Sequence, residues 1–214
     1  MRILVVGAGG HGRTILEAMR QAETSQTPLQ AVGFVDDAPG LLGTLCDGLP
    51  VLGVTQDIVS IEHDAVIVGL GDNRKRKAVF ESLSKEGVVM ATVIHPSATV
   101  ARTAQIGVGT YIGAQAVIGV DAVVGDNVII TGTGCIGHHN RIESHAHIGP
   151  GVTTTRAVTI GEGVLLGAGA TFLSDVQVGA WSSVMAASLV ALDVPENVLA
   201  GGSPARAIRH LTDE

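Results

Sequence analysis

An apolar residue recurs at every sixth position through the C-terminal half of the chain. Between residues 100 and 190 the pattern holds at fifteen of sixteen positions, and Thr154 is the exception. The next residue is glycine in nine of the sixteen cases, and the residue two positions earlier is almost always small or β-branched. The series runs through Val100, Ile106, Ile112, Ile118, Val124, Ile130, Ile136, Ile142, Ile148, Thr154, Ile160, Leu166, Phe172, Val178, Val184 and Val190.

A period of six fits neither an α-helix, which repeats about every 3.6 residues, nor an isolated strand, which alternates about every two. It predicts a solenoid in which each hexad forms one flat face of a triangular prism and three hexads close one coil. The recurring aliphatic side chains then stack into an inward column. The glycines lie at the corners, where positive φ or tight crowding excludes a Cβ. Sixteen hexads give about five coils.

The first 93 residues follow a different pattern, in which short apolar runs alternate with helical periodicity. The runs predict strands over 2–6, 31–35, 65–69 and 88–94, and helices over 12–22 and 73–85. Asn73 is a candidate N-cap for the second helix, and Gly87 is a candidate stop signal. Such alternation predicts a small parallel sheet with helices on its faces, a Rossmann-like half. We therefore expect two domains, an α/β domain over 1–93 and a parallel β-helix over 94–214.

Composition narrows the classes of function. The chain has 214 residues, of which 46% are hydrophobic and only 2% aromatic, so the core must be aliphatic. The net charge of −7, with 13 basic residues, disfavours binding to nucleic acid. Two cysteines, Cys46 and Cys135, cannot make a disulfide framework. The N-terminus does not resemble a signal peptide, and no apolar run is long enough for a membrane span, so we expect a cytoplasmic protein.

A glycine-rich turn joins the first expected strand to the first helix. Gly7, Gly9 and Gly12 are spaced as in the dinucleotide fingerprint, and such a turn presents backbone N–H groups and a helix N-terminus to a phosphate. Asp36 and Asp37 end the second strand, where an acid often binds a ribose or a base. An NAD-dependent enzyme is one interpretation, although 93 residues make only half of a full doubly wound domain. A turn that only packs helix against strand is another.

Histidines are the candidate catalytic residues. Four of the eight fall close together, at His138, His139, His145 and His147. A neutral imidazole can take a proton from an amine or a hydroxyl near pH 7, as acyl transfer from a thioester requires. That chemistry needs no metal and no covalent intermediate. A zinc site built from the four histidines is an alternative that the spacing neither requires nor excludes.

The hexads resemble those of the hexapeptide-repeat, left-handed β-helix acyltransferases. The order of the motifs along the chain resembles one branch of that family, the sialic-acid O-acetyltransferases and nucleotide-4-amino-sugar N-acetyltransferases. That order is Gly-x-Gly-Gly-His-Gly at 7–12, Val-Asp-Asp at 35–37, Gly-Asp-Asn-Arg at 71–74, Ile-His-Pro at 94–96 and then the hexads. The resemblance implies a homotrimer with active sites between neighbouring prisms, acetyl-CoA as co-substrate, no metal, and a role in making cell-surface polysaccharides.

The resemblance also implies a nucleotide-sugar site in the N-terminal domain. Its expected residues are Gly9, Gly10 and His11 along the phosphates, Asp36 and Asp37 at the base or ribose, and Gly71, Asp72 and Asn73 closing the site.

By the same resemblance, the family pattern Ile/Val-x-His-Asp/Glu-x falls on residues 136–140 and makes His138 the general base. Two positions depart from the pattern: His139 stands where the acid usually follows the base, and Thr131 stands where an asparagine is often found. The imidazole of His138 therefore lacks its usual carboxylate, and we consider His139, Glu143, Thr131 or a backbone carbonyl as the group that orients it.

The acetyl-CoA site implied by the resemblance lies further along the chain. His147 matches a histidine near the thioester, and the segment 201–206 resembles the Gly-x-Pro-Ala-Lys/Arg ending of the family. The expected residues are His147, Gly167, Ala168, Gly202, Pro204 and Arg206, and Arg209 is a further candidate for the phosphates.

The leading hypothesis is acetyl transfer from acetyl-CoA to the amino group of a nucleotide-linked amino-sugar. One alternative changes the acceptor to the hydroxyl of a sialic-acid-like sugar. Another, suggested by His139 and Thr131, is a trimeric binding or scaffold protein that has lost the chemistry.

Overall fold

The computed structural model describes residues 1–22 and 29–211. Contacts divide the chain into two units, Met1–Pro96 and Ser97–Glu214. The boundary falls three residues after the one that we expect from the sequence.

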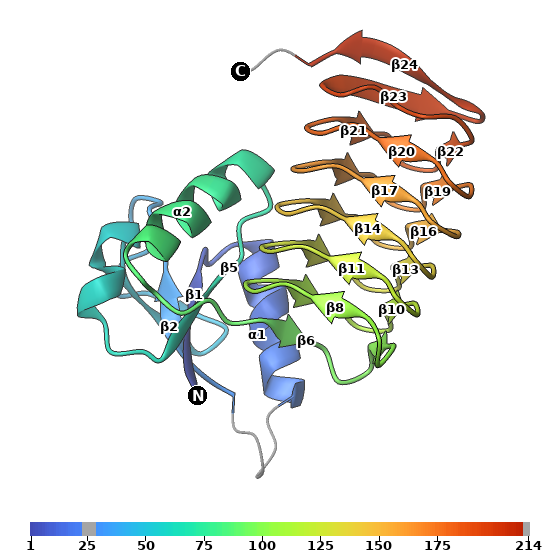
Figure 1. Ribbon diagram of the computed structural model, residues 1–214. Coiled ribbons are helices and arrows are strands. Elements are labelled where there is room, and N and C mark those ends of the chain that lie inside the picture. Colours follow the sequence, from blue (N-terminus) through green and yellow to red (C-terminus); the bar gives the residue numbers. More distant parts are fainter. Residues whose placement is uncertain (23–28, 212–214) are drawn as a thin grey trace. The chain divides into compact units, whose positions relative to one another are not determined.

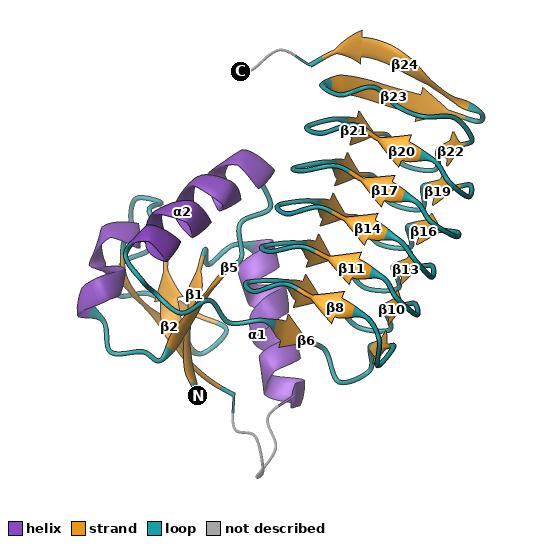
Figure 2. Cartoon of the chain, viewed as in Figure 1, coloured by secondary structure: helices purple, strands orange, loops and turns teal. Residues whose placement is uncertain are grey.

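The first unit is a five-stranded sheet with helices packed on it (Figure 2). Its strands lie in the order β3-β4-β2-β1-β5, and all neighbours are parallel except the β3–β4 pair. The elements are β1 (Arg2–Val6), α1 (Gly10–Ala22), β2 (Gln30–Val35), β3 (Leu45–Cys46), β4 (Leu49–Gly53), the 3₁₀-helix η1 (Thr55–Ser60), β5 (Ala65–Val68), α2 (Asn73–Lys85) and β6 (Val93–Ile94). The expected small parallel sheet is confirmed.

Helix α1 begins immediately after the glycine-rich turn. Ile15 and Met19 are buried at helical spacing, as the sequence predicts. A Cβ at Gly12 would lie 1.7 Å from the carbonyl oxygen of Gly7, so glycine is needed there for the helix to approach β1. Gly7 itself has φ of +94°, which L side chains rarely adopt.

Helix α2 has the predicted length but a different N-cap. The carboxylate of Asp72, rather than Asn73, accepts the backbone N–H of Lys75 at 2.9 Å, and Asn73 is the first residue of the helix. Phe80 and Leu83 are buried on its inner face. Gly87 ends the helix with φ of +77°, in agreement with the sequence prediction.

Two features of this unit differ from the sequence prediction. The expected strand over 88–94 is wrong for most of its length. Only Val93–Ile94 is a strand, and Met90 makes a single parallel bridge to Val66. The sequence analysis also missed the β3–β4 hairpin and η1, because these elements are too short to show a period.

The second unit confirms the parallel β-helix (Figure 1). Two-residue strands stack in three columns, and each strand pairs in parallel with the strand eighteen residues later, as in Ile118 with Ile136. The first column holds β7 (Thr99–Val100), β10 (Val117–Ile118), β13 (Cys135–Ile136), β16 (Thr153–Thr154), β19 (Thr171–Phe172) and β22 (Leu189–Val190). The second holds β8 (Gln105–Ile106), β11 (Val123–Val124), β14 (Arg141–Ile142), β17 (Thr159–Ile160) and β20 (Gln177–Val178). The third holds β9 (Tyr111–Ile112), β12 (Ile129–Ile130), β15 (His147–Ile148), β18 (Leu165–Leu166) and β21 (Ser183–Val184).

The stacked turns that lead from one column of strands to the next form the three edges of the prism. Edge 1 follows the strands of the first column and includes residues 137–140. Edge 2 follows the second column and includes 143–146, and edge 3 follows the third column and includes 167–170. The coils end in an antiparallel pair, β23 (Val198–Gly202) and β24 (Ala205–His210), of which β23 lies beside β21.

The sequence offers two reasons for glycine at the corners, positive φ and crowding, and the structure distinguishes them. Positive φ occurs three residues after the inward residue, for example at Asp121 (+56°) and His139 (+60°), and many of these residues are not glycine. The glycine that directly follows the inward residue is required by crowding instead. A Cβ at Gly137 would lie 2.2 Å from the carbonyl oxygen of Thr155 in the next coil.

Aliphatic residues fill the prism as expected, and Ile136, Ile148 and Leu166 are fully buried. Both cysteines are free thiols. In the described ranges, no helix has the length and apolar character to cross a membrane.

Candidate functional site

His138 lies on edge 1, at the corner that leads away from β13. Its side chain is exposed, and its backbone is fixed from the neighbouring coils. Its carbonyl accepts the N–H of Ala157 at 3.1 Å, and a Cβ at Gly119 would come within 2.7 Å of its backbone nitrogen. The stacked coils therefore hold the imidazole of His138 at a defined point on an exposed edge.

The ring of His138 contacts the ring of the next residue. Nδ1 of His138 lies 2.9 Å from Nδ1 of His139, and the two rings are nearly perpendicular, with centroids 5.1 Å apart. His139, which stands at the sequence position where the family usually has an acid, therefore contacts the ring of His138 directly. Asp121, which the sequence analysis did not consider, lies beside His139. Its Oδ2 is 3.6 Å from Nε2 of that ring. Counting one coil of eighteen residues back from His139 would have found it.

The other two residues expected to orient His138 lie elsewhere. Thr131 lies on edge 3, where its hydroxyl donates to the carbonyl of Ile148 at 2.9 Å. Glu143 lies on edge 2, where its carboxylate accepts the guanidinium of Arg141. Different edges of one prism do not meet, so neither side chain contacts His138 within one chain.

The four clustered histidines do not converge. His145, on edge 2, is buried, and its Nδ1 accepts the side-chain amide of Asn127 at 2.8 Å. His147 is buried in β15, between Ile129 and Leu165 of the neighbouring coils. Across the described ranges, no three His, Cys, Asp or Glu side chains gather as a metal site would require.

Most residues expected at acetyl-CoA lie along edge 3. Ala168 and Gly167 sit at its corner, where the carbonyl of Ala168 accepts the N–H of Ala187 in the next coil. The N–H of Gly202 donates to the hydroxyl of Ser188 at 3.2 Å, which places the β23–β24 turn on the same edge. Pro204 follows a cis peptide bond in that turn. Arg206 is exposed on β24, and its guanidinium donates to the carbonyl of Ala205.

The first unit contains a hollow of about 400 Å³ at the carboxyl ends of β1 and β2, lined among others by Asp36, Asp37, Thr55, Leu70 and Lys75. That volume falls in the range of small-molecule sites. The residues Thr55 and Lys75 were missed by the sequence analysis. Lys75 stands three residues after the Gly-Asp pair that it recognised, whereas Thr55 carries no motif.

Both expected acids line this hollow and hold its walls. The carboxylate of Asp36 accepts the backbone N–H groups of Ala8 and Ala38, each at 2.8 Å. The carboxylate of Asp37 accepts the backbone N–H of Thr55 at 2.7 Å and its hydroxyl at 2.8 Å. The two acids therefore tie the glycine-rich turn and the start of η1 to the end of β2.

The glycine-rich turn is open at two of its glycines. A Cβ at Gly9 or Gly10 would meet nothing within 4 Å, whereas a Cβ at Gly71 would meet the ring of His11 at 2.7 Å. Burial, and then the positive charge of Arg76, lower the pKa of His11. The Arg76 side chain is fully buried and donates to the carbonyl of Leu70 at 3.0 Å. Burial lowers the pKa of Arg76 to about 10, against the opposing effect of the Asp72 carboxylate.

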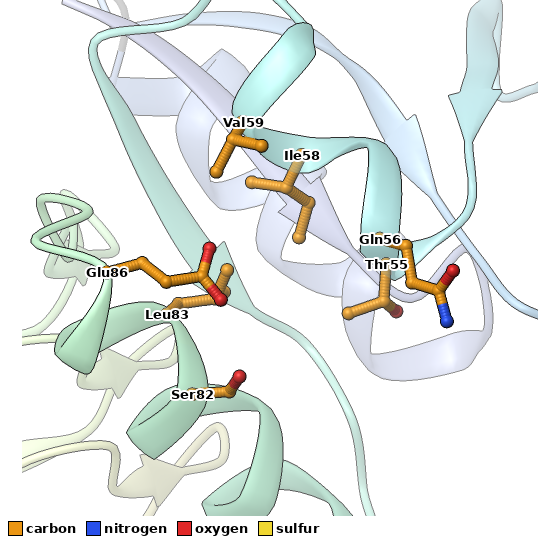
Figure 3. A pocket seen from close by; sticks show the side chains of 7 residues that line it. All are labelled: Thr55, Gln56, Ile58, Val59, Ser82, Leu83 and Glu86. Carbon is orange, nitrogen blue, oxygen red and sulfur yellow. The ribbon is translucent and has the colours of Figure 1, made fainter.

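A second hollow lies between η1 and the C-terminal part of α2 (Figure 3). Its walls include Ile58 and Val59 on one side and Ser82, Leu83 and Glu86 on the other. At about 130 Å³ it is too small for a nucleotide.

Comparison with known proteins agrees with both units. The family model of the PglD N-terminal domain matches residues 2–83. The acetyltransferase domain of PglB from Neisseria gonorrhoeae FA1090, solved in complex with acetyl coenzyme A, is 30% identical, with a TM-score of 0.89 over 97% of this chain and 98% of that chain. PerB from Caulobacter crescentus, solved with CoA and GDP-perosamine, is 30% identical, with a TM-score of 0.87 over 98% of each chain.

Among curated proteins, the GDP-perosamine N-acetyltransferase of Escherichia coli O157:H7 is 24% identical over 96% of this chain and 95% of its own length. The chain also matches yeast and plant acetyltransferases, of which it spans 33% to 45% of the length. The agreement with PglB and PerB covers both units, from the glycine-rich turn to the last coil. The chain therefore belongs to the hexapeptide-repeat, left-handed β-helix sugar acetyltransferases, in the branch that carries a PglD-type N-terminal domain.

Proposed function

We propose that this protein transfers the acetyl group of acetyl-CoA to the amino group of a nucleotide-linked amino-sugar. The observation that carries the proposal is the exposed imidazole of His138, whose Nδ1 is held by His139 while its other nitrogen remains available to a substrate. Two relatives solved with acetyl coenzyme A, or with CoA and GDP-perosamine, support the choice of substrates.

The reaction needs one base and no covalent enzyme intermediate. The amine nitrogen of the sugar attacks the thioester carbonyl carbon, and Nε2 of His138 takes the proton that the nitrogen loses. The C–S bond of the resulting tetrahedral species breaks, and the CoA thiolate leaves. The imidazolium returns its proton to the thiolate, so that the products are the acetamido-sugar and the free thiol of CoA.

The nucleotide part of the acceptor is assigned to the hollow of the first unit. The N-terminus of α1 begins at Gly10, and its first N–H groups have no acceptor within the helix, which suits a diphosphate. Gly9 and Gly10 leave the backbone uncovered, and the ammonium of Lys75 lines the same hollow. Asp36 and Asp37 shape the wall and keep lone pairs that a ribose hydroxyl or a base N–H can use.

The proposal includes a homotrimer. His138 lies on edge 1, whereas Ala168 and Gly202 lie on edge 3, so one prism cannot bring the base and the proposed acetyl-CoA residues together. A second copy that presents its edge 3 to edge 1 of the first completes the site, and three copies close the ring. Large apolar side chains exposed on the β-helix, among them Leu165, Leu173 and Met185, supply surface for such contacts.

The test is the release of thiol from acetyl-CoA with a panel of UDP-, GDP- and dTDP-linked amino-sugars, together with their hydroxyl counterparts. We expect turnover only with amino acceptors. The His138→Ala variant should lose about 10²- to 10⁴-fold in kcat/KM, the usual contribution of a general base, with an unchanged circular dichroism spectrum. Turnover with the hydroxyl sugars alone would replace N-acetylation by O-acetylation, and no turnover with any acceptor would reject the proposal.

A further inference from the structure

Edge 1 carries three side chains in a row, and the last of them is a carboxylate from the preceding coil. His138 contacts His139 through their Nδ1 atoms at 2.9 Å, and Nε2 of His139 faces Oδ2 of Asp121 at 3.6 Å. We propose that Asp121, acting through His139, is the positioning carboxylate of the base His138. The inference rests on the proposed function and names the group that replaces the acid missing from position 139.

The backbone places Asp121 and His139 together. One coil contains eighteen residues, so position 139 stacks on position 121, and the N–H of His139 donates to the carbonyl of Val120 at 2.9 Å. Both residues have the same left-handed conformation, with φ of +56° and +60°. Because the two corners have equal geometry, the side chains leave the edge in parallel, and the carboxylate lies beside the second imidazole.

The hydrogen positions along the row are mutually consistent. For Nε2 of His138 to accept a proton, its Nδ1 must carry one and donate it to Nδ1 of His139. The ring of His139 then has its own hydrogen on Nε2, which is the nitrogen that faces Asp121. The carboxylate thus favours the tautomer of His139 that accepts from His138, and through it the tautomer of His138 that can act as a base.

Asp121 also stabilises the charge that develops during the reaction. When His138 takes up a proton, the positive charge is shared with His139 through the Nδ1 contact, and a carboxylate 3.6 Å away lowers its energy. The separation is that of an ion pair rather than of a direct hydrogen bond. The side chains of His139 and Asp121 are 61% and 51% exposed, so water weakens the interaction and its effect on rate is moderate.

Neighbouring positions on edge 1 offer no equivalent acid beside His139. The position one coil after His139 is Ala157. Asp175, one coil further, has φ of +66° and accepts the guanidinium of Arg156 at 2.6 Å. Asp175 therefore provides a matched control: it has the same residue type, the same edge, the same backbone conformation and a charged partner of its own.

The first arm of the test compares Asp121→Asn with Asp175→Asn. Asparagine tolerates the left-handed conformation, so both variants should fold. We expect Asp121→Asn to lower kcat by about 5- to 10-fold, the factor that one unit charge at this distance produces in water-like surroundings, with the KM values of both substrates unchanged. Asp175→Asn should keep the kcat of the unmodified protein. Equal kcat values for the two variants would overturn the inference.

The second arm tests whether Asp121 acts through His139. The His139→Asp variant places an acid directly after the base, as in the family pattern, and bypasses Asp121. In that background the further Asp121→Asn substitution should change kcat by less than about twofold. The same 5- to 10-fold loss in both backgrounds would show that Asp121 acts by another route and would overturn the inference.

The last arm needs no acceptor and separates this inference from the proposed function. Nitrogen-15 spectra of the histidine side chains report which ring nitrogen carries the hydrogen. We expect the Nδ1–H tautomer for neutral His138 and the Nε2–H tautomer for neutral His139, and a mixture for His139 in Asp121→Asn but not in Asp175→Asn. Unchanged tautomers would overturn the inference. Full turnover by His138→Ala would instead reject the base of the proposed function, whatever the spectra show.

Discussion

The hydroxyl of Thr154 lies 3.0 Å from the side-chain amide nitrogen of Asn140, inside the aliphatic column of the β-helix. Both residues are almost completely buried. The amide of Asn140 also donates to the carbonyl of Thr155 at 2.8 Å and accepts the N–H of Val158, so it closes the corner that carries His138. The one polar residue in the apolar series is therefore the partner of a buried amide beside the proposed base.

Replacing Thr154 by valine keeps the shape and removes the hydroxyl. We expect Thr154→Val to lower the free energy of unfolding by about 1–3 kcal/mol, because one N–H of the buried Asn140 amide loses its acceptor. Thr154→Ser keeps the hydroxyl, loses one methyl group and should cost only about 1 kcal/mol. Denaturant unfolding of the two variants at equal protein concentration makes the comparison. A valine variant as stable as the serine variant would mean that the amide finds another acceptor.

The glycine-rich turn offers a test of the nucleotide site that spares the fold. A Cβ at Gly10 would meet nothing within 4 Å, so we expect Gly10→Val to fold normally while it covers the N-terminus of α1. We expect a large rise in the KM of the nucleotide-sugar and little change in the KM of acetyl-CoA. Gly12→Val is the contrasting variant: its side chain collides with the carbonyl of Gly7, and it should fail to fold. An unchanged KM of the nucleotide-sugar in Gly10→Val would place the nucleotide elsewhere, whereas equal losses for both substrates would indicate misfolding.

The half-buried His11 should make stability depend on pH. Burial and Arg76 lower its pKa in the folded state below the value of about 6.5 for an unfolded chain, so the unfolded state binds more protons between the two values. The contribution of His11 to the free energy of unfolding is then fully present above pH ~6.5, and it falls as the pH drops through that value towards the pKa of the folded state. We expect His11→Gln to lose less stability than the unmodified protein between about pH 7.5 and 5.5, measured by denaturant unfolding. Equal losses would show that other groups dominate this range.

The β-helix could be predicted from the sequence because one physical requirement recurs in every hexad. Each inward position must be apolar, and each position after it is small wherever the next coil crowds it, as at Gly137. The α/β unit was predicted less completely. Its β3–β4 hairpin has too few residues to reveal a period, and the apolar run over 88–94 forms a strand only at Val93–Ile94, with a single bridge at Met90.

The site shows the same division between local and long-range information. His138 follows from a local motif, but the group that faces its neighbour comes from a residue eighteen positions before His139, on a coil that a local motif does not span. The N-cap of α2 was misplaced by one residue, because Asp72 and Asn73 are both good caps and only the backbone decides between them. Thr131 was considered because the family often has an asparagine at that position, and Glu143 because it could replace the missing carboxylate, whereas the prism puts both on other edges than His138.

The separation of His138 and Ala168 on two edges predicts complementation between inactive chains. In the proposed trimer each site takes edge 1 from one chain and edge 3 from its neighbour. His138→Ala removes the base from edge 1. Ala168→Phe blocks the acetyl-CoA residues on edge 3, because Ala168 is exposed and its backbone contact to Ala187 is kept. Each variant alone should form an inactive trimer of normal sedimentation coefficient.

Mixed trimers of the two variants should regain activity. A site is intact only where an Ala168→Phe chain supplies His138 and a His138→Ala chain supplies Ala168, and each condition holds for half of the chains in an equal mixture. About a quarter of the sites are then complete, so co-refolded equal amounts should give about a quarter of the unmodified kcat. If both edges of one chain served the same site, every site would carry one of the two lesions and mixing would restore nothing. A protein that sediments as a monomer and keeps full turnover would likewise contradict the shared site.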